Sequence, residues 1–143
     1  VEIRKERYRK ALVLVNRHVL NTVADLYRKG KTLVLVSNAD VFDKYYWGES
    51  PLSKYFARAI FSCDVGVMKP QREIYEIAMK AVNADPAASV FIGDGGHDEL
   101  VGAKQAGLAT VLTTEIIRDL WPERIAYLSK HADFVIGNLA ELC

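Results

Sequence analysis

The chain has 143 residues, half of them hydrophobic and 26% charged, which suits one compact domain and excludes two large ones. Its formal net charge of +1 argues against a nucleic-acid partner. No apolar stretch approaches the roughly 20 residues that span a bilayer, so no membrane partner is expected. Cys63 and Cys143 fit neither a metal site nor a disulfide framework, which favours a reducing, cytoplasmic location.

The first half of the chain predicts two helices and a buried strand. Residues 2–13 mix charges with isolated apolar side chains and predict a helix, and a second helix ends at Gly30, a residue typical of the position after a helix. The run 32–36 is continuous, apolar and rich in β-branched residues, which indicates a strand covered on both faces. Residues 39–61 predict a helical segment, an aromatic cluster and a Gly-Glu-Ser-Pro turn.

The second half alternates strands with helices. A brief strand is expected at 61–63, helices at 71–82, 99–106 and 122–130, and strands at 89–92, 109–112 and 134–136. Such alternation with short loops predicts an α/β fold with a doubly wound parallel sheet.

Polar residues stand where the predicted strands end. Ser37 and Asn38 follow the first strand, and the acidic loop 93–99 follows the strand at 89–92. Between them, the segment 66–70 carries Lys69 into a helix. Because ligands bind outside the carboxyl ends of strands in such sheets, we expect these groups to converge. A hydroxyl, an ammonium group and carboxylates are the parts that a phosphoryl-transfer site with Mg²⁺ needs, although each of them alone is typical of an ordinary turn.

These motifs together resemble the haloacid dehalogenase (HAD) superfamily. Residues 33–38 resemble its motif II, an apolar strand ending in Ser or Thr. Residues 66–70 resemble motif III with its lysine, and 91–99 resemble motif IV. The ending 132–139 is similar to the last strand and turn of these proteins. The resemblance, over roughly 15–143, implies a Rossmann-like core and a Mg²⁺-dependent phosphatase that acts on a small phosphorylated metabolite.

The resemblance also assigns roles to single residues. Ser37 would hydrogen-bond a phosphate oxygen, helped by the backbone of Asn38, and Lys69 would offset charge on the nucleophile and the phosphoryl group. Asp94 matches the acidic ligand of Mg²⁺. Spacing to the closing Ala106-Gly107 puts the second acid of motif IV on Glu99.

Two neighbours in this loop remain less defined. Asp98 is a further metal candidate at a position where the family often has Asn, and His97 is expected to be exposed rather than in contact with substrate. The aromatic cluster Tyr45, Tyr46 and Trp47 either borders the substrate or packs internally.

The first motif of the family, an apolar strand ending in Asp-x-Asp, is missing from the sequence. The sole candidate for it is 11–18, with Asn16 and His18 where both acids belong, and an amide cannot act as the nucleophile. We prefer to interpret 1–18 as the tail of a helical cap and 19–143 as a core that lacks its first strand. Such a core would expose two strand edges, which an additional segment, strand exchange or a homodimer would cover.

Two alternatives remain at this stage, and a third is excluded. One alternative is a related enzyme, a metal-free 2-haloacid dehalogenase, although Gly93-Asp94 favours the phosphatase. A non-catalytic HAD-like binding module is motivated by the missing nucleophile. A receiver domain is excluded by order, because Lys69-Pro70 precedes Asp94 in this chain.

Overall fold

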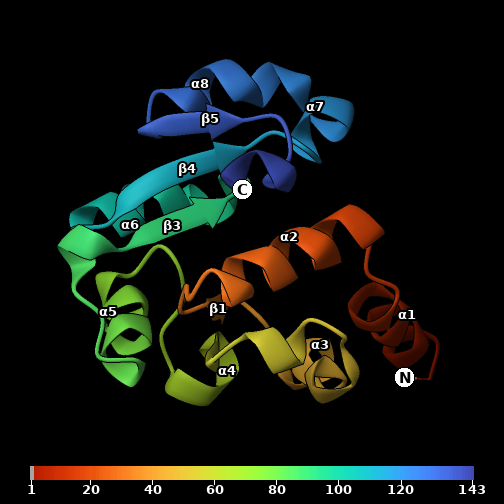
Figure 1. The fold of residues 1–143 in the computed structure, drawn as a ribbon. Helices are drawn as coiled ribbons and strands as arrows, with labels where there is room; N and C mark the ends of the chain where they lie inside the picture. The colour runs from red at the N-terminus through yellow and green to blue at the C-terminus, as the bar shows by residue number, and fades with distance from the viewer. Residues whose placement is uncertain (1) are drawn as a thin grey trace.

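Parallel strands alternate with helices along the chain in the computed structural model, which describes residues 2–143 (Figure 1). The strands are β1 (Val34–Ser37), β2 (Arg58–Phe61), β3 (Val90–Gly93), β4 (Ala109–Thr113) and β5 (Phe134–Ile136). The helices are α1 (Glu2–Val13), α2 (Arg17–Arg28), α3 (Val41–Lys44), α4 (Ser62–Val65), α5 (Arg72–Ala81), α6 (Glu99–Gln105), α7 (Ile117–Leu120) and α8 (Ile125–Ser129). Short 3-10 turns occur at Trp47–Glu49, Ser53–Tyr55, Pro86–Ala88, Gly96–Asp98, Pro122–Arg124 and Leu139–Leu142. The predicted α/β class with parallel strands is confirmed.

The strands form two separate sheets rather than one. β1 pairs in parallel with β2, with Val34 opposite Arg58. β3, β4 and β5 form a second parallel sheet in that order, with Val90 opposite Ala109. Within residues 2–143 no strand pairing joins β1 to β3, so the predicted single sheet is divided between these two strands.

Helix α5 holds the two sheets together on one face. Its Ile74, Tyr75, Ala78 and Met79 recur at helical spacing and are buried. They pack in one cluster with Ile60 of β2 and with residues of α6, and Phe91 of β3 lies against the same cluster. The core therefore lies between α5, α6 and the edges of both sheets.

The outer part of the larger sheet has a core of its own. Leu100 of α6, Leu112 of β4, Ile117 of α7 and Leu128 of α8 are almost fully buried against one another. This cluster packs α6, α7 and α8 against β4.

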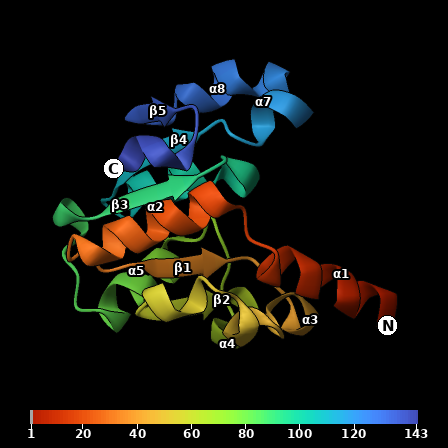
Figure 2. The same ribbon diagram turned by 45° about the vertical axis from the view of Figure 1, so that its right-hand side comes forward.

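The two N-terminal helices behave differently. α2 buries Thr22, Val23 and Ala24 and runs alongside the space between β1 and β3 (Figure 2). α1 buries no side chain and extends away from the sheets, where it contacts α3.

Several sequence predictions need correction at this level. The brief strand expected at 61–63 is instead β2, which ends at Phe61, and 62–65 form helix α4. The stretch 39–61 contains α3, which ends at Lys44, and two 3-10 turns on either side of the predicted turn residues Ser50 and Pro51. The less favoured interpretation of 11–18 as a strand does not hold, since α1 continues through Val13. Val1, the first residue of the expected cap tail, lies outside the described residues.

Candidate active site

The carboxyl end of β1 carries the first two predicted site residues. Ser37 ends the strand and Asn38 follows it, both partly buried. The Asn38 side chain accepts a hydrogen bond from the Lys69 backbone N–H at 2.8 Å and donates one to the Lys69 C=O at 2.9 Å. Asn38 therefore fixes the backbone of the lysine segment with its side chain, whereas the sequence predicted a role for its backbone.

Lys69 is turned inward from this fixed backbone. Its Nζ lies 2.6 Å from the Glu99 carboxylate, and the two side chains are only 13% and 7% exposed. The same ammonium group lies 5.6 Å from the centre of the Phe91 ring on β3. An isolated charge is costly in such a place, so each of the two groups offsets the burial of the other near the strand ends.

Glu99 is held by a further set of contacts at the start of α6. Its carboxylate accepts the Gly95 backbone N–H at 3.0 Å, and the Tyr75 hydroxyl donates to its C=O at 2.7 Å. Burial raises the pKa of the Tyr75 hydroxyl, and the nearby charge of Glu99 raises it further, so Tyr75 remains a donor. A Cβ at Gly93 would overlap the Glu99 carboxylate, so glycine is needed where β3 ends.

The loop after β3 has an uncommon backbone. His97 and Asp98 adopt φ values of 55° and 51°, in the left-handed region that non-glycine residues seldom occupy. Each such residue costs about 1 kcal/mol or more, and these conformations are concentrated at functional sites. His97 and Asp98 are both exposed, as expected for His97.

The three predicted acids of this loop take different positions. Asp94 is partly buried and accepts the Gly96 N–H at 3.0 Å through one oxygen, which leaves its second oxygen for another ligand. Glu99 is engaged by Lys69 and Gly95 instead. Asp98 makes no capping bond to α6.

A metal site is not assembled by protein groups alone. Across residues 2–143, no three His, Cys, Asp or Glu side chains gather closely enough to hold an ion. Mg²⁺, however, is usually held by one or two carboxylates, with water and phosphate oxygens completing its shell. Asp94 fits that demand as a hard oxygen donor at the strand ends, and Glu99 fits it only if it leaves Lys69.

The segment from Met68 to Pro70 is positioned from α6 as well as from Asn38. A Cβ at Gly102 would overlap the Pro70 carbonyl oxygen and the Tyr75 ring, so α6 approaches this segment closely only because residue 102 is glycine. The sequence analysis missed Gly102 and Tyr75. In the sequence, these two residues differ from their neighbours only in lying on the helices that follow the lysine and acidic motifs. Their position on a helix does not predict which residues they contact.

The aromatic cluster divides between the two roles left open for it. Trp47 packs at an angle against Phe56 and Phe61, so it belongs to the support under β2. Tyr45 is 64% exposed and packs edge-on against Tyr46. Only Tyr45 is thus accessible to a ligand in the way the substrate hypothesis requires.

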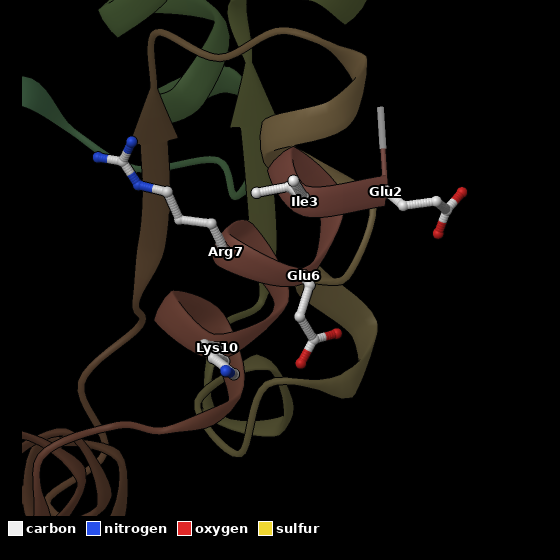
Figure 3. A pocket seen from close by; sticks show the side chains of 5 residues that line it. All are labelled: Glu2, Ile3, Glu6, Arg7 and Lys10. Atoms are coloured by element: carbon white, nitrogen blue, oxygen red, sulfur yellow. The ribbon is translucent and has the colours of Figure 1, made fainter.

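A hollow of about 590 Å³ lies along α1 and is unrelated to these residues. Its lining residues are Glu2, Ile3, Glu6, Arg7 and Lys10, all from one helix (Figure 3). It contains none of the elements that carry Ser37, Lys69 or Asp94, so we assign it no part in the site.

The sequence matches a known protein family. A profile of haloacid dehalogenase-like hydrolases matches residues 2–107, well over half of the chain. The chain belongs to the haloacid dehalogenase-like hydrolase family. The expected resemblance to this family is therefore confirmed. Within residues 2–143, no helix is long and apolar enough to cross a membrane.

Two curated relatives of this HAD-like chain are enzymes. "Bifunctional epoxide hydrolase 2" of Rattus norvegicus is 33% identical over 74% of this chain and 20% of that protein. "Glyceraldehyde 3-phosphate phosphatase" of Methanothermobacter thermautotrophicus is 29% identical over 69% of this chain and 46% of that protein. The HAD-like chain thus spans less than half the length of either relative.

Solved structures agree on the fold. The HAD phosphatase from Thermococcus onnurineus superimposes with a TM-score of 0.76 at 23% identity and covers 90% of this chain and 56% of that one. The 2-haloacid dehalogenase from Pseudomonas syringae pv. Tomato DC3000 gives a TM-score of 0.69 at 28% identity, over 90% of this chain and 51% of that one. Both phosphatase and dehalogenase therefore share this HAD-like fold.

Proposed function

We propose that this HAD-like chain provides the phosphate-binding and Mg²⁺-binding part of a phosphatase that acts on small phosphorylated metabolites. The observation that carries the proposal is the link from Asn38 through Lys69 to Glu99, which gathers three separate motifs at the strand ends. Relatives named as phosphatases support the reaction class. The free, exposed Cys63 and Cys143 suit a reducing compartment such as the cytoplasm.

The chain's own residues would bind and orient the phosphoryl group. The Ser37 hydroxyl, at the end of β1, would donate to a phosphate oxygen, and the Lys69 ammonium group would supply a positive charge to the phosphoryl group. Asp94 is the carboxylate for Mg²⁺, which when bound would neutralise phosphate charge. The nucleophile is a separate matter, since no Asp-x-Asp pair occurs in the 143 residues.

Binding without turnover is the expected behaviour of this chain. The test is calorimetry with inorganic phosphate and Mg²⁺, followed by assays on a panel of small phosphate esters. The Ser37→Ala variant should bind phosphate more weakly than the wild type. In the Asp94→Asn variant, phosphate binding should no longer depend on Mg²⁺. Asp119→Asn, at an exposed position, serves as a matched control.

Three results would contradict the proposal. Failure of phosphate and Mg²⁺ to bind would remove both ligand roles. If the chain hydrolysed phosphate esters and Asp94→Asn abolished this activity, the 143 residues would themselves contain a nucleophile. Full hydrolytic activity in EDTA would favour the metal-free dehalogenase reaction instead.

A non-catalytic HAD-like binding module is the second candidate, and the missing Asp-x-Asp pair favours it. It predicts the same binding by the isolated chain. The two candidates separate when an apolar strand ending in Asp-x-Asp is added to the chain, because only the phosphatase should then hydrolyse esters.

A further inference from the structure

A cluster of positive charges lies at the amino ends of β1 and β2, on the edge of the smaller sheet opposite from the candidate active site. It consists of Arg28, Lys29, Lys31, Lys54 and Arg58, all of them exposed, and we call it the basic patch. Figure 2 shows β1 running toward α1, so α2 ends and β1 begins on the far side of the molecule. The basic patch is therefore remote from the groups proposed to bind phosphate.

Contacts between two chain segments bring these charges together. The Tyr27 ring at the end of α2 packs edge-on against the Tyr55 ring, with 5.5 Å between the ring centres. The Lys54 ammonium group lies 5.1 Å from the centre of the Tyr55 ring. In the sheet, Val34 at the start of β1 lies opposite Arg58 at the start of β2. The end of α2, the turn before β2 and the start of β2 therefore belong to one surface.

Both segments lack the negative charges that would neutralise the basic patch. No Asp or Glu occurs in 26–39 or in 50–63. Arg28 pairs with Asp25 at 2.7 Å. In the part of the chain that the structure describes, the other four side chains of the patch form no ion pair. The formal net charge of +1 conceals this local excess because it averages over the whole chain.

The end of helix α2 does not account for the whole basic patch. Basic side chains at the end of a helix interact favourably with its dipole, which explains Arg28 and Lys29. Lys31 lies beyond the end of α2, and Lys54 and Arg58 belong to other elements. Like charges on one surface repel each other, and an anionic partner removes this repulsion.

We propose that the basic patch is a docking surface for an acidic segment of a polypeptide in an extended conformation. Lys31 comes three residues before Val34, which lies opposite Arg58, so the patch spans about 10 Å along the strands. Three residues of extended chain cover the same length. Carboxylates along such a segment can each approach a separate cation, and the flexible lysine side chain with its compact charge accepts them singly.

Two other anionic partners fit the basic patch less well. A nucleic-acid interface commonly makes about six to ten phosphate contacts and uses open aromatic rings for stacking, whereas Lys54 already covers the Tyr55 ring. Surfaces that lie on anionic lipid combine basic residues with apolar side chains that enter the bilayer, and 28–32 has no large apolar side chain. The inference does not depend on phosphatase chemistry, because peptide binding is measured without any substrate.

The test uses the full chain and a fluorescently labelled, blocked peptide of about five glutamates, which is long enough to span the basic patch. Fluorescence anisotropy should show binding that weakens as salt is added, because salt screens exposed charges. A glutamine peptide of the same length should not bind. Failure of the glutamate peptide to bind at low salt would overturn the proposal.

Charge reversal gives a matched pair of double variants. Lys31→Glu with Lys54→Glu changes one charge in each segment, and peptide affinity should fall about tenfold, because each reversal removes an attraction and adds a repulsion. Arg124→Glu with Lys130→Glu makes the same change in net charge at exposed positions outside the basic patch and should alter affinity by no more than about twofold. Equal weakening in both variants would show that binding follows net charge alone and would overturn the proposal.

Two further probes identify the class of partner. At equal charge, the glutamate peptide should bind more tightly than an oligothymidylate, and phosphatidylserine vesicles should not sediment the chain. Tighter binding of the oligonucleotide, or sedimentation that Lys31→Glu with Lys54→Glu abolishes, would assign the basic patch to nucleic acid or to lipid and would overturn the proposal.

Discussion

The contacts within each sheet differ in kind from the contacts between the two sheets. Inside each sheet, parallel backbone ladders fix the register of every strand. Between the sheets only side chains and helices make the connection, chiefly α5, the Asn38 clamp and the pair of Lys69 with Glu99. The alignment of the candidate site therefore depends on these side-chain contacts, which we call the joint. Substitutions in the joint should lower the stability of the protein more than substitutions at exposed positions.

Removal of Lys69 should disturb the joint most. Lys69→Met leaves Glu99 without its ion-pair partner where its side chain is 7% exposed, and we expect a loss of about 4 kcal/mol in the free energy of unfolding. Urea denaturation measures this loss. Arg72→Met breaks an exposed pair with Glu76 and should cost no more than about 0.5 kcal/mol. Similar losses in both variants would show that Lys69 and Glu99 do not form a buried connection.

Truncation of the apolar part of the joint comes next. Ile74 is fully buried in α5 between the sheets, so Ile74→Ala should cost about 3 kcal/mol through lost packing and a residual cavity. The control is Ile116→Ala, because Ile116 is 58% exposed and should change the same denaturation midpoint only slightly. A loss below about 1 kcal/mol for Ile74→Ala would mean that α5 does not carry the joint.

The Tyr75 hydroxyl should contribute less. Tyr75→Phe removes its bond to the Glu99 C=O and should lower stability by about 1 kcal/mol at neutral pH. Because burial raises the pKa of Tyr75, its contribution is fully present below the unfolded pKa of about 10 and is lost as the pH rises above the folded pKa. The variant should therefore lose less stability than the wild type in alkali.

The control for this position is Tyr127→Phe. Tyr127 is 54% exposed, so neither the neutral nor the alkaline unfolding curve should change appreciably. An identical alkaline response of Tyr75→Phe and the wild type would contradict the structural role of the hydroxyl.

The smallest effect is expected inside the larger sheet, at Asp133 before β5. The Lys104 ammonium group and the Thr110 N–H lower the pKa of Asp133, so its contribution is present above the unfolded pKa of about 3.9 and is lost as the pH falls through the folded pKa. Thermal unfolding of Asp133→Asn between neutral and acid pH should therefore show a weaker acid dependence than the wild type. Asp119→Asn, on exposed α7, should retain the full acid dependence.

Much of the fold could be predicted because its signals are local. The apolar periodicity of 71–82 corresponds to α5, and the strand at 134–136 has the predicted bounds. The predicted bounds of helices and strands were wrong where turn residues interrupt the apolar periodicity of the sequence, as in 39–63. The order of the motifs likewise predicted that Ser37, Lys69 and Asp94 come near the strand ends.

The sequence by itself determined most of the strands and helices and the family of this protein, because side-chain periodicity and motif order are properties of short stretches of chain. Only the tertiary structure decided that Asn38 clamps Lys69, that Lys69 pairs with Glu99 and that the strands divide into two sheets. These features join residues about 30 positions apart in the chain or arise from strand pairing, and such contacts depend on packing that no local pattern encodes.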